Sequence, residues 1–108
     1  MLDAIRQLDD GSTGLLGQVI QLYFQSAPGL LGDLRRGFDG QDHELLKRAA
    51  HTLKSSSGNV GAVRLADLCR RIETAARAGT LGPDVPRADE VDAEFERVRA
   101  ALEAEAAK

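Results

Sequence analysis

Residues 49–62 read AAHTLKSSSGNVGA, and they follow a segment whose apolar residues recur at helical spacing. At about 100° per residue, the apolar side chains of this segment fall on one face of a helix, and His51 lies on the opposite face. The pattern therefore predicts an amphipathic helix that ends near Gly58–Gly61, with His51 exposed to water. The face expected to be buried consists of Leu46, Ala49, Ala50 and Leu53.

Apart from Glu44, the residues within two turns of His51 on the same helix face carry basic or small side chains. Lys47, Arg48 and Lys54 are basic, whereas Ser55 and Gly58 have little bulk. Residues three and four positions apart are neighbours on a helix surface. We therefore expect an exposed imidazole with a cationic rim and an open approach on its C-terminal side, where the surface of a partner protein fits closely.

The rest of the chain repeats the helical pattern. Apolar residues keep helical spacing over residues 14–38, 62–78 and from about 87 onward. The first of these stripes stays in phase across Pro28, which favours one kinked helix over two separate ones. Asp42 is expected to cap the helix that carries His51, and Gly79 is expected to end the next helix.

The turn before the His51 helix is expected at Gly37, Gly40 and Asp42. A shorter stripe over residues 2–8 suffices for a short helix at the N-terminus. Four long helices with short connections bury their apolar faces most simply against one another. The expected fold is therefore all-α, an antiparallel four-helix bundle with a short extra N-terminal helix, formed as a single domain over residues 1–108.

Composition narrows the classes of function. Aromatic residues make up only 4% of the 108 residues, and alanine and leucine dominate, which favours packed helices over a sheet. A net charge of -3 argues against binding to nucleic acid. The lone cysteine, Cys69, cannot form an internal disulfide, and no apolar run is long enough for a signal peptide or a membrane span. A cytoplasmic protein, or a cytoplasmic piece of a larger one, is expected.

Three kinds of site lack support in the sequence. The two histidines, His43 and His51, would lie about 12 Å apart along one helix, too far to share a metal ion, and Cys69 lies on an apolar stripe. The serines that follow His51 have no acid placed to orient the imidazole as their base. The glycines of residues 58–61 lack the spacing of a nucleotide-binding loop.

An exposed histidine is most often only a solvated surface residue, but the neighbours of His51 favour a nucleophile. A neutral imidazole attacks phosphorus well near neutral pH, and the nearby ammonium of Lys54 disfavours the imidazolium form. The same lysine can offset the negative charge of an attached phosphoryl group. The residues thus describe a phosphoryl acceptor that depends on a partner for the rest of its chemistry.

Residues 50–62, followed by Leu65, Leu68-Cys69 and Ile72-Glu73, resemble histidine-containing phosphotransfer (HPt) domains. The resemblance covers nearly the whole chain and is densest over residues 42–73. The pattern of residues 58–62 with Leu68-Cys69 is more similar to the HPt domains of hybrid sensor kinases. Chemotaxis-type histidine kinases share the histidine and the lysine, so the phosphoacceptor domain of such a kinase remains an alternative.

The resemblance implies a role for each matching residue. His51 matches the phosphorylated histidine, and Lys54 matches the basic residue three positions later. The family often has glycine where Ser55 stands, and Gly58 matches a small position beside the histidine. Glu73 falls where some members place a polar residue near the imidazole, although an exposed helix glutamate is an equally good expectation.

The function implied is a phosphorelay intermediate without an ATP site of its own. His51 would accept a phosphoryl group from an aspartate of one response-regulator receiver domain and pass it to an aspartate of another, with Mg²⁺ supplied by the receiver and no cofactor in this chain. Docking would involve Arg48, Ser55, Gly58 and Glu73 together with Leu15 or Leu22, unless those leucines belong to a wide buried face. A helical adaptor that docks a receiver without accepting phosphate is the alternative from a different class.

Overall fold

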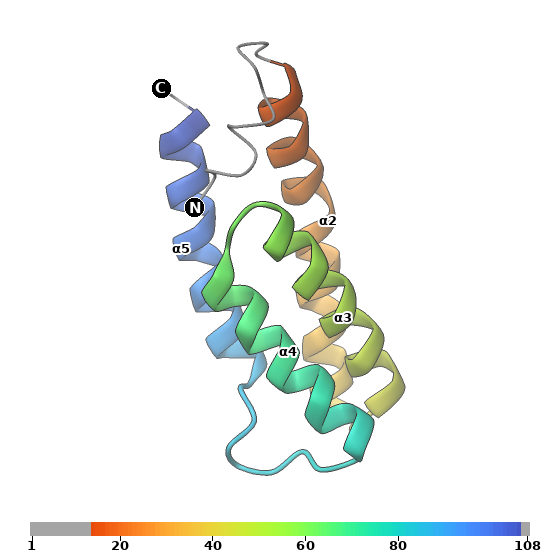
Figure 1. Cartoon of the computed structure of the whole chain (residues 1–108). Coiled ribbons are helices and arrows are strands. Elements are labelled where there is room, and N and C mark those ends of the chain that lie inside the picture. Colours follow the sequence, from red (N-terminus) through yellow and green to blue (C-terminus); the bar gives the residue numbers. More distant parts are fainter. Residues whose placement is uncertain (1–13, 107–108) are drawn as a thin grey trace.

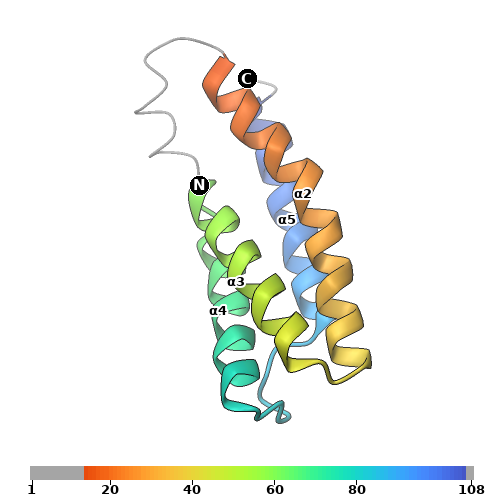
Figure 2. The ribbon, with the colours of Figure 1, turned by 90° about the vertical axis from the view of Figure 1, so that its right-hand side faces the viewer.

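The computed structural model describes residues 14–106, with side chains for residues 17–105. These residues form four helices and no strand: α2 (Gly14–Asp39), α3 (His43–Asn59), α4 (Val63–Ala78) and α5 (Ala88–Ala106) (Figure 1). The α3–α4 hairpin forms one layer and α2 with α5 forms the other (Figure 2). The expected all-α bundle is confirmed, whereas the short helix expected at residues 2–8 lies outside the described residues.

Helix α2 runs through Pro28 without interruption, as one long helix. The expectation that Gly37 belongs to the following turn is wrong, because Gly37 is buried inside α2 against Leu46 of α3. A Cβ atom at Gly37 would lie 2.7 Å from Leu46 Cγ, so the absence of a side chain lets the two helices approach closely. The turn itself spans residues 40–42, and Asp42 caps α3 by accepting a hydrogen bond from the Leu45 amide at 3.1 Å.

The core lies between the two layers. The expected buried face of α3 is confirmed, since Leu46, Ala49, Ala50 and Leu53 are all buried. The hydroxyl groups of Tyr23 in α2 and Ser57 in α3 are hydrogen-bonded at 2.9 Å inside this core, which satisfies both polar groups. The Tyr23 ring also packs against Phe95 of α5, and this joins three helices at one point.

Contacts at the end of the bundle that holds the α4–α5 loop pack α5 against α2. Gly79 ends α4 in the left-handed conformation, as expected, and a loop leads to α5. The Arg87 guanidinium lies 5.3 Å from the centre of the Phe38 ring, and Arg35 pairs with Asp89 and Asp92.

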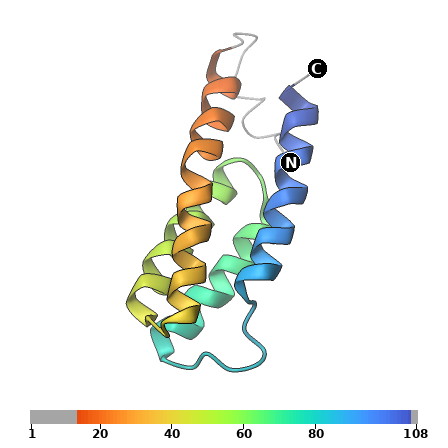
Figure 3. The same cartoon turned by 180° about the vertical axis from the view of Figure 1, so that it is seen from behind.

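At the opposite end of the bundle, α2 and α5 extend beyond the α3–α4 turn (Figure 3). Within residues 14–106, no helix combines the length and apolar character needed to cross a membrane.

Candidate functional site

His51 lies on α3 with its side chain 60% exposed, as its position opposite the buried face of the helix predicts. The rest of the site comes from α4, which packs antiparallel to α3 (Figure 1). The imidazole therefore has one edge toward α4 and the other toward solvent.

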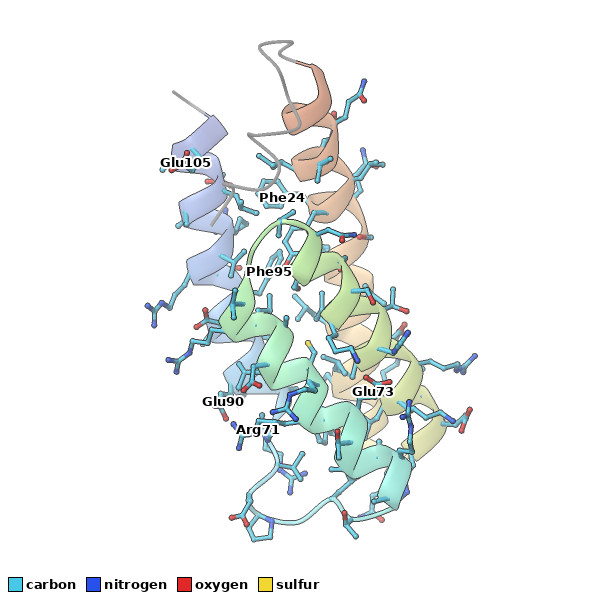
Figure 4. The ribbon with its side chains drawn as sticks, in the orientation of Figure 1. Phe24, Arg71, Glu73, Glu90, Phe95 and Glu105 are labelled. Carbon is cyan, nitrogen blue, oxygen red and sulfur yellow. The ribbon has the colours of Figure 1, made fainter. Side chains whose placement is uncertain are left out.

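Glu73 of α4 is the partner of the imidazole. The Glu73 side chain, which is 6% exposed, lies between α4 and α3 (Figure 4). His51 Nδ1 is 2.9 Å from Glu73 Oε2, and Lys54 Nζ is 2.7 Å from Glu73 Oε1. Arg77, one turn further along α4, donates to Oε2 at 2.8 Å. Of the two alternatives for Glu73, the position beside the imidazole agrees with the structure and the exposed helix glutamate is wrong, because Glu73 is the buried centre of a four-residue cluster.

The charge of Glu73 determines which nitrogen of His51 carries the proton. Burial by itself would raise the pKa of the Glu73 carboxyl, but hydrogen bonds from Lys54 and His51 outweigh burial and hold the pKa below its ordinary value. An ionised carboxylate only accepts hydrogen bonds, so the proton of the neutral imidazole lies on Nδ1. The lone pair of Nε2 is then available on the edge of the ring away from Glu73.

Basic side chains line a hollow of about 370 Å³ around the imidazole. Lys47 and Arg48 enter it from α3, and Arg77 enters it from α4. The predicted cationic rim is thus present, with Arg77 as an addition that the sequence analysis missed. A glutamate followed four residues later by an arginine is a common helix ion pair, and this spacing was the available signal.

The small residues after His51 leave the surface open. Ser55 is exposed, and a Cβ atom added at Gly58 would meet no atom within 4 Å. Nothing in the described part of the fold therefore requires glycine at position 58, although glycine inside a helix is unfavourable. This is the arrangement expected if the space above Gly58 serves a binding partner.

A second, more apolar hollow of about 240 Å³ lies between α2 and the end of α3. Leu22 stands at its edge with 64% of its surface exposed, so the prediction of an exposed apolar residue holds for Leu22. Thr52 and Ser55 lie between His51 and this hollow around the α3 surface. The side chain of Leu15 lies outside the described residues.

A metal site and a reactive cysteine were the other candidates for chemistry in this chain. Among residues 14–106, no three histidine, cysteine, aspartate or glutamate side chains are grouped so as to hold a metal ion. Cys69 is fully buried, and burial raises the pKa of its thiol to about 12. Cys69 is therefore an unreactive core residue, as its place on the apolar stripe predicts.

Comparisons with known proteins agree with this geometry. The family model of the Hpt domain matches residues 18–101. Histidine-containing phosphotransfer protein 2 of Arabidopsis thaliana is 29% identical over 98 residues, which cover 88% of this chain and 63% of that protein. Histidine-containing phosphotransfer protein 1 of the same plant is 35% identical over 68 residues, which cover 60% of this chain and 44% of that protein. This chain therefore spans less than two thirds of the length of these curated relatives.

A solved structure shows the same fold. The crystal structure of histidine-containing phosphotransfer protein B (HptB) from Pseudomonas aeruginosa PAO1 matches with a TM-score of 0.82 and 26% identity, over 94% of this chain and 88% of that one. The family model matches residues 18–101, and the helical bundle with its histidine on α3 agrees with that match. The chain belongs to the Hpt domain family.

Proposed function

We propose that this chain is a phosphocarrier in which His51 accepts a phosphoryl group from a receiver-domain aspartate and passes it to another receiver aspartate. The observation that carries the proposal is the hydrogen bond between His51 Nδ1 and the ionised Glu73 carboxylate. It leaves Nε2 unprotonated on an exposed ring, which is the state required of a nitrogen nucleophile. The family match and the HptB-like fold support the same reaction.

The transfer step requires no acid or base beyond this arrangement. The Nε2 lone pair attacks the phosphorus of the aspartyl phosphate, the N–P bond forms, and the P–O bond to the aspartate breaks. The aspartate leaves as a carboxylate, and the imidazole ring takes up positive charge while it keeps its Nδ1 proton. The Glu73 carboxylate, 2.9 Å from Nδ1, stabilises that charge. Return of the phosphoryl group to a second receiver reverses these steps.

The receiver supplies the rest of the site. In this proposal it brings the aspartate and the Mg²⁺ that neutralises charge on the transferred group. This chain supplies the nucleophile, the ammonium of Lys54 and a surface that admits the receiver. That surface runs from Arg48 and His51 over Ser55 and Gly58 to Leu22. Leu15 is included in it on the strength of the sequence pattern alone.

The setting is part of the proposal. We place this single domain, residues 1–108, in the cytoplasm, as a carrier without an ATP site that serves a hybrid histidine kinase in the same chain or in a separate one. The pattern of residues 58–62 with Leu68-Cys69 favours that class over a chemotaxis-type kinase. Neither nucleic acid nor a membrane is a proposed partner.

A transfer assay tests the reaction. A panel of receivers is phosphorylated in advance with labelled phosphate and mixed with the domain, and label stable in base but labile in acid is followed. The proposal expects label on the wild type and none on the His51→Gln variant. Absence of label from the wild type with every receiver would refute the relay. If such a receiver still binds both the wild type and His51→Ala, the domain is a docking adaptor.

A further inference from the structure

The basic side chains around His51 differ in whether they are already paired. Lys54 and Arg77 both donate to Glu73, at 2.7 and 2.8 Å. Lys47 Nζ lies 3.1 Å from Glu44 Oε1. These three cations therefore have carboxylate partners before any phosphoryl group arrives.

Arg48 is different. Its side chain is exposed and lines the same hollow as the imidazole, and no described residue makes a hydrogen bond or ion pair with it. Arg48 stands three residues before His51 on α3, so the two side chains are neighbours on the helix surface. Helical side chains tilt toward the N-terminus of the helix, which brings the imidazole over the turn that carries Arg48.

The position of Glu73 also separates Lys54 from the reacting nitrogen. Glu73 binds the Nδ1 edge of the ring through Oε2 and Lys54 through Oε1, so the Lys54 ammonium is held on the Glu73 side. Nε2 faces away from that side. For Lys54 or Arg77 to reach a phosphoryl group on Nε2, either must leave or share a buried carboxylate that it now neutralises.

The location of the charges favours an additional cation at the phosphoryl oxygens. Lys54 and Arg77 against Glu73 leave one net positive charge, and the phosphorylated ring that keeps its Nδ1 proton carries another, but the Glu73 cluster lies on the Nδ1 side of the ring. A phosphoryl group brings a charge of about -2 near neutral pH. A guanidinium that has no partner among the described residues can bind two of the phosphoryl oxygens without breaking any contact that these residues make.

We propose that Arg48 is the residue that binds the phosphoryl group while it resides on His51. This inference rests on the proposed function, because it requires His51 to be the phosphoacceptor. Arg48 would hold the phosphoryl oxygens on the solvent side of the ring, while Lys54 and Arg77 remain with Glu73. It is a phosphoryl-binding residue that acts in the phosphorylated domain even without a receiver.

The test begins with phosphoramidate, a small phosphoryl donor, so that no receiver is needed. The phosphorylated domain is titrated by ³¹P NMR, which reads the second ionisation of the phosphoryl group. A bound guanidinium favours the dianion, so the Arg48→Gln variant should raise the phosphoryl pKa by about half to one pH unit. Arg48→Lys keeps the charge but loses the paired donors and should give an intermediate midpoint.

Arg70→Gln is the matched control. Arg70 is an exposed arginine of α4 that pairs with Asp67 and lies outside the hollow of His51, and its loss changes the net charge equally. Its midpoint should equal that of the wild type. Equal midpoints for Arg48→Gln and Arg70→Gln, with helicity retained, would overturn the inference.

A second arm uses a labelled receiver at equilibrium with the domain. Loss of one exposed charge contact predicts roughly threefold to fivefold less label on Arg48→Gln than on the wild type. If no receiver transfers label but phosphoramidate does, the relay fails and the ³¹P titration still decides the role of Arg48. Absence of phosphohistidine at His51 with phosphoramidate would overturn both proposals.

Discussion

Replacing Glu73 by alanine should slow phosphoryl transfer to His51 by about tenfold. The Glu73 carboxylate accepts the hydrogen bond of His51 Nδ1 at a distance of 2.9 Å and that of Lys54 Nζ at 2.7 Å, so the substitution removes what orients the imidazole. Without it the proton is free to occupy Nε2, which then has no lone pair for attack on phosphorus.

The magnitude follows from the hydrogen bond that is lost. A hydrogen bond to a charged group contributes about 1.5–3 kcal/mol, which corresponds to roughly tenfold to hundredfold in rate. His51 is 60% exposed, so water replaces part of the interaction and the lower end of the range applies. The Glu73→Gln variant keeps an oxygen that accepts from Nδ1 but loses the charge, and its rate should fall by about threefold.

Rapid-quench measurements with a phosphorylated receiver give the transfer rate at saturating receiver, which separates the chemical step from docking. Circular dichroism verifies that each variant keeps its helices. Transfer by Glu73→Ala at the wild-type rate would refute the idea that Glu73 prepares the imidazole. A loss as large in Glu73→Gln as in Glu73→Ala would show that charge, and not the hydrogen bond to Nδ1, is what matters.

Four other variants or conditions test the same structure. Gly58→Leu should leave the free domain folded, or more stable by up to about 1 kcal/mol in urea unfolding, because a Cβ at position 58 meets no described atom within 4 Å. It should nevertheless block transfer from a receiver, because the proposed docking surface covers position 58. Gly37→Ala should destabilise the fold by about 1–3 kcal/mol, since its Cβ would meet Leu46 at 2.7 Å. Gln41→Gly should stabilise it by a few tenths to about 1 kcal/mol, because Gln41 has a φ of 51°. Because the pKa of Glu73 is lowered in the folded domain, its ionised carboxylate stabilises the fold above its ordinary pKa of 4.5. This stability is lost as the pH falls through the pKa of Glu73 in the folded domain. Thermal melts of Glu73→Gln should therefore lack this acid-dependent loss of stability.

The helices follow from the sequence because their signals are local. Apolar spacing identifies each buried stripe, and the residues at the ends act through their own backbone neighbours. Asp42 caps α3 through the amide three residues later, and Gly79 supplies the left-handed conformation that ends α4. The exposure of His51 follows from the same periodicity.

The features that the sequence analysis missed or left open depend on contacts between helices. Glu73 lies at the edge of the apolar face of α4, and it is buried because side chains of α3 pack against it. The pairing of Tyr23 with Ser57 joins residues 34 positions apart, which periodicity does not report. Gly37 suggested a turn because glycine is common there, but it serves a close approach between helices.

The docking surface connects these features to the proposed reaction. The apolar hollow beside Leu22 and the charged hollow around His51 occupy two sides of the exposed face of α3, and only small or uncharged side chains such as Thr52 and Ser55 stand between them. A receiver that covers both hollows makes apolar contacts at the hollow beside Leu22. Its phosphorylated aspartate then lies at the hollow around His51. Binding and transfer are therefore expected to be separable by mutation.

The central claim is that the phosphoryl group resides on Nε2 of His51 while Nδ1 keeps its proton. NMR of ¹⁵N-labelled histidine side chains, recorded after transfer from a phosphorylated receiver, identifies the nitrogen bonded to phosphorus. Phosphorus coupled to Nε2 of His51, with a protonated Nδ1, is the result predicted by the Glu73 hydrogen bond. Phosphorus on Nδ1, or on any residue other than His51, would contradict it.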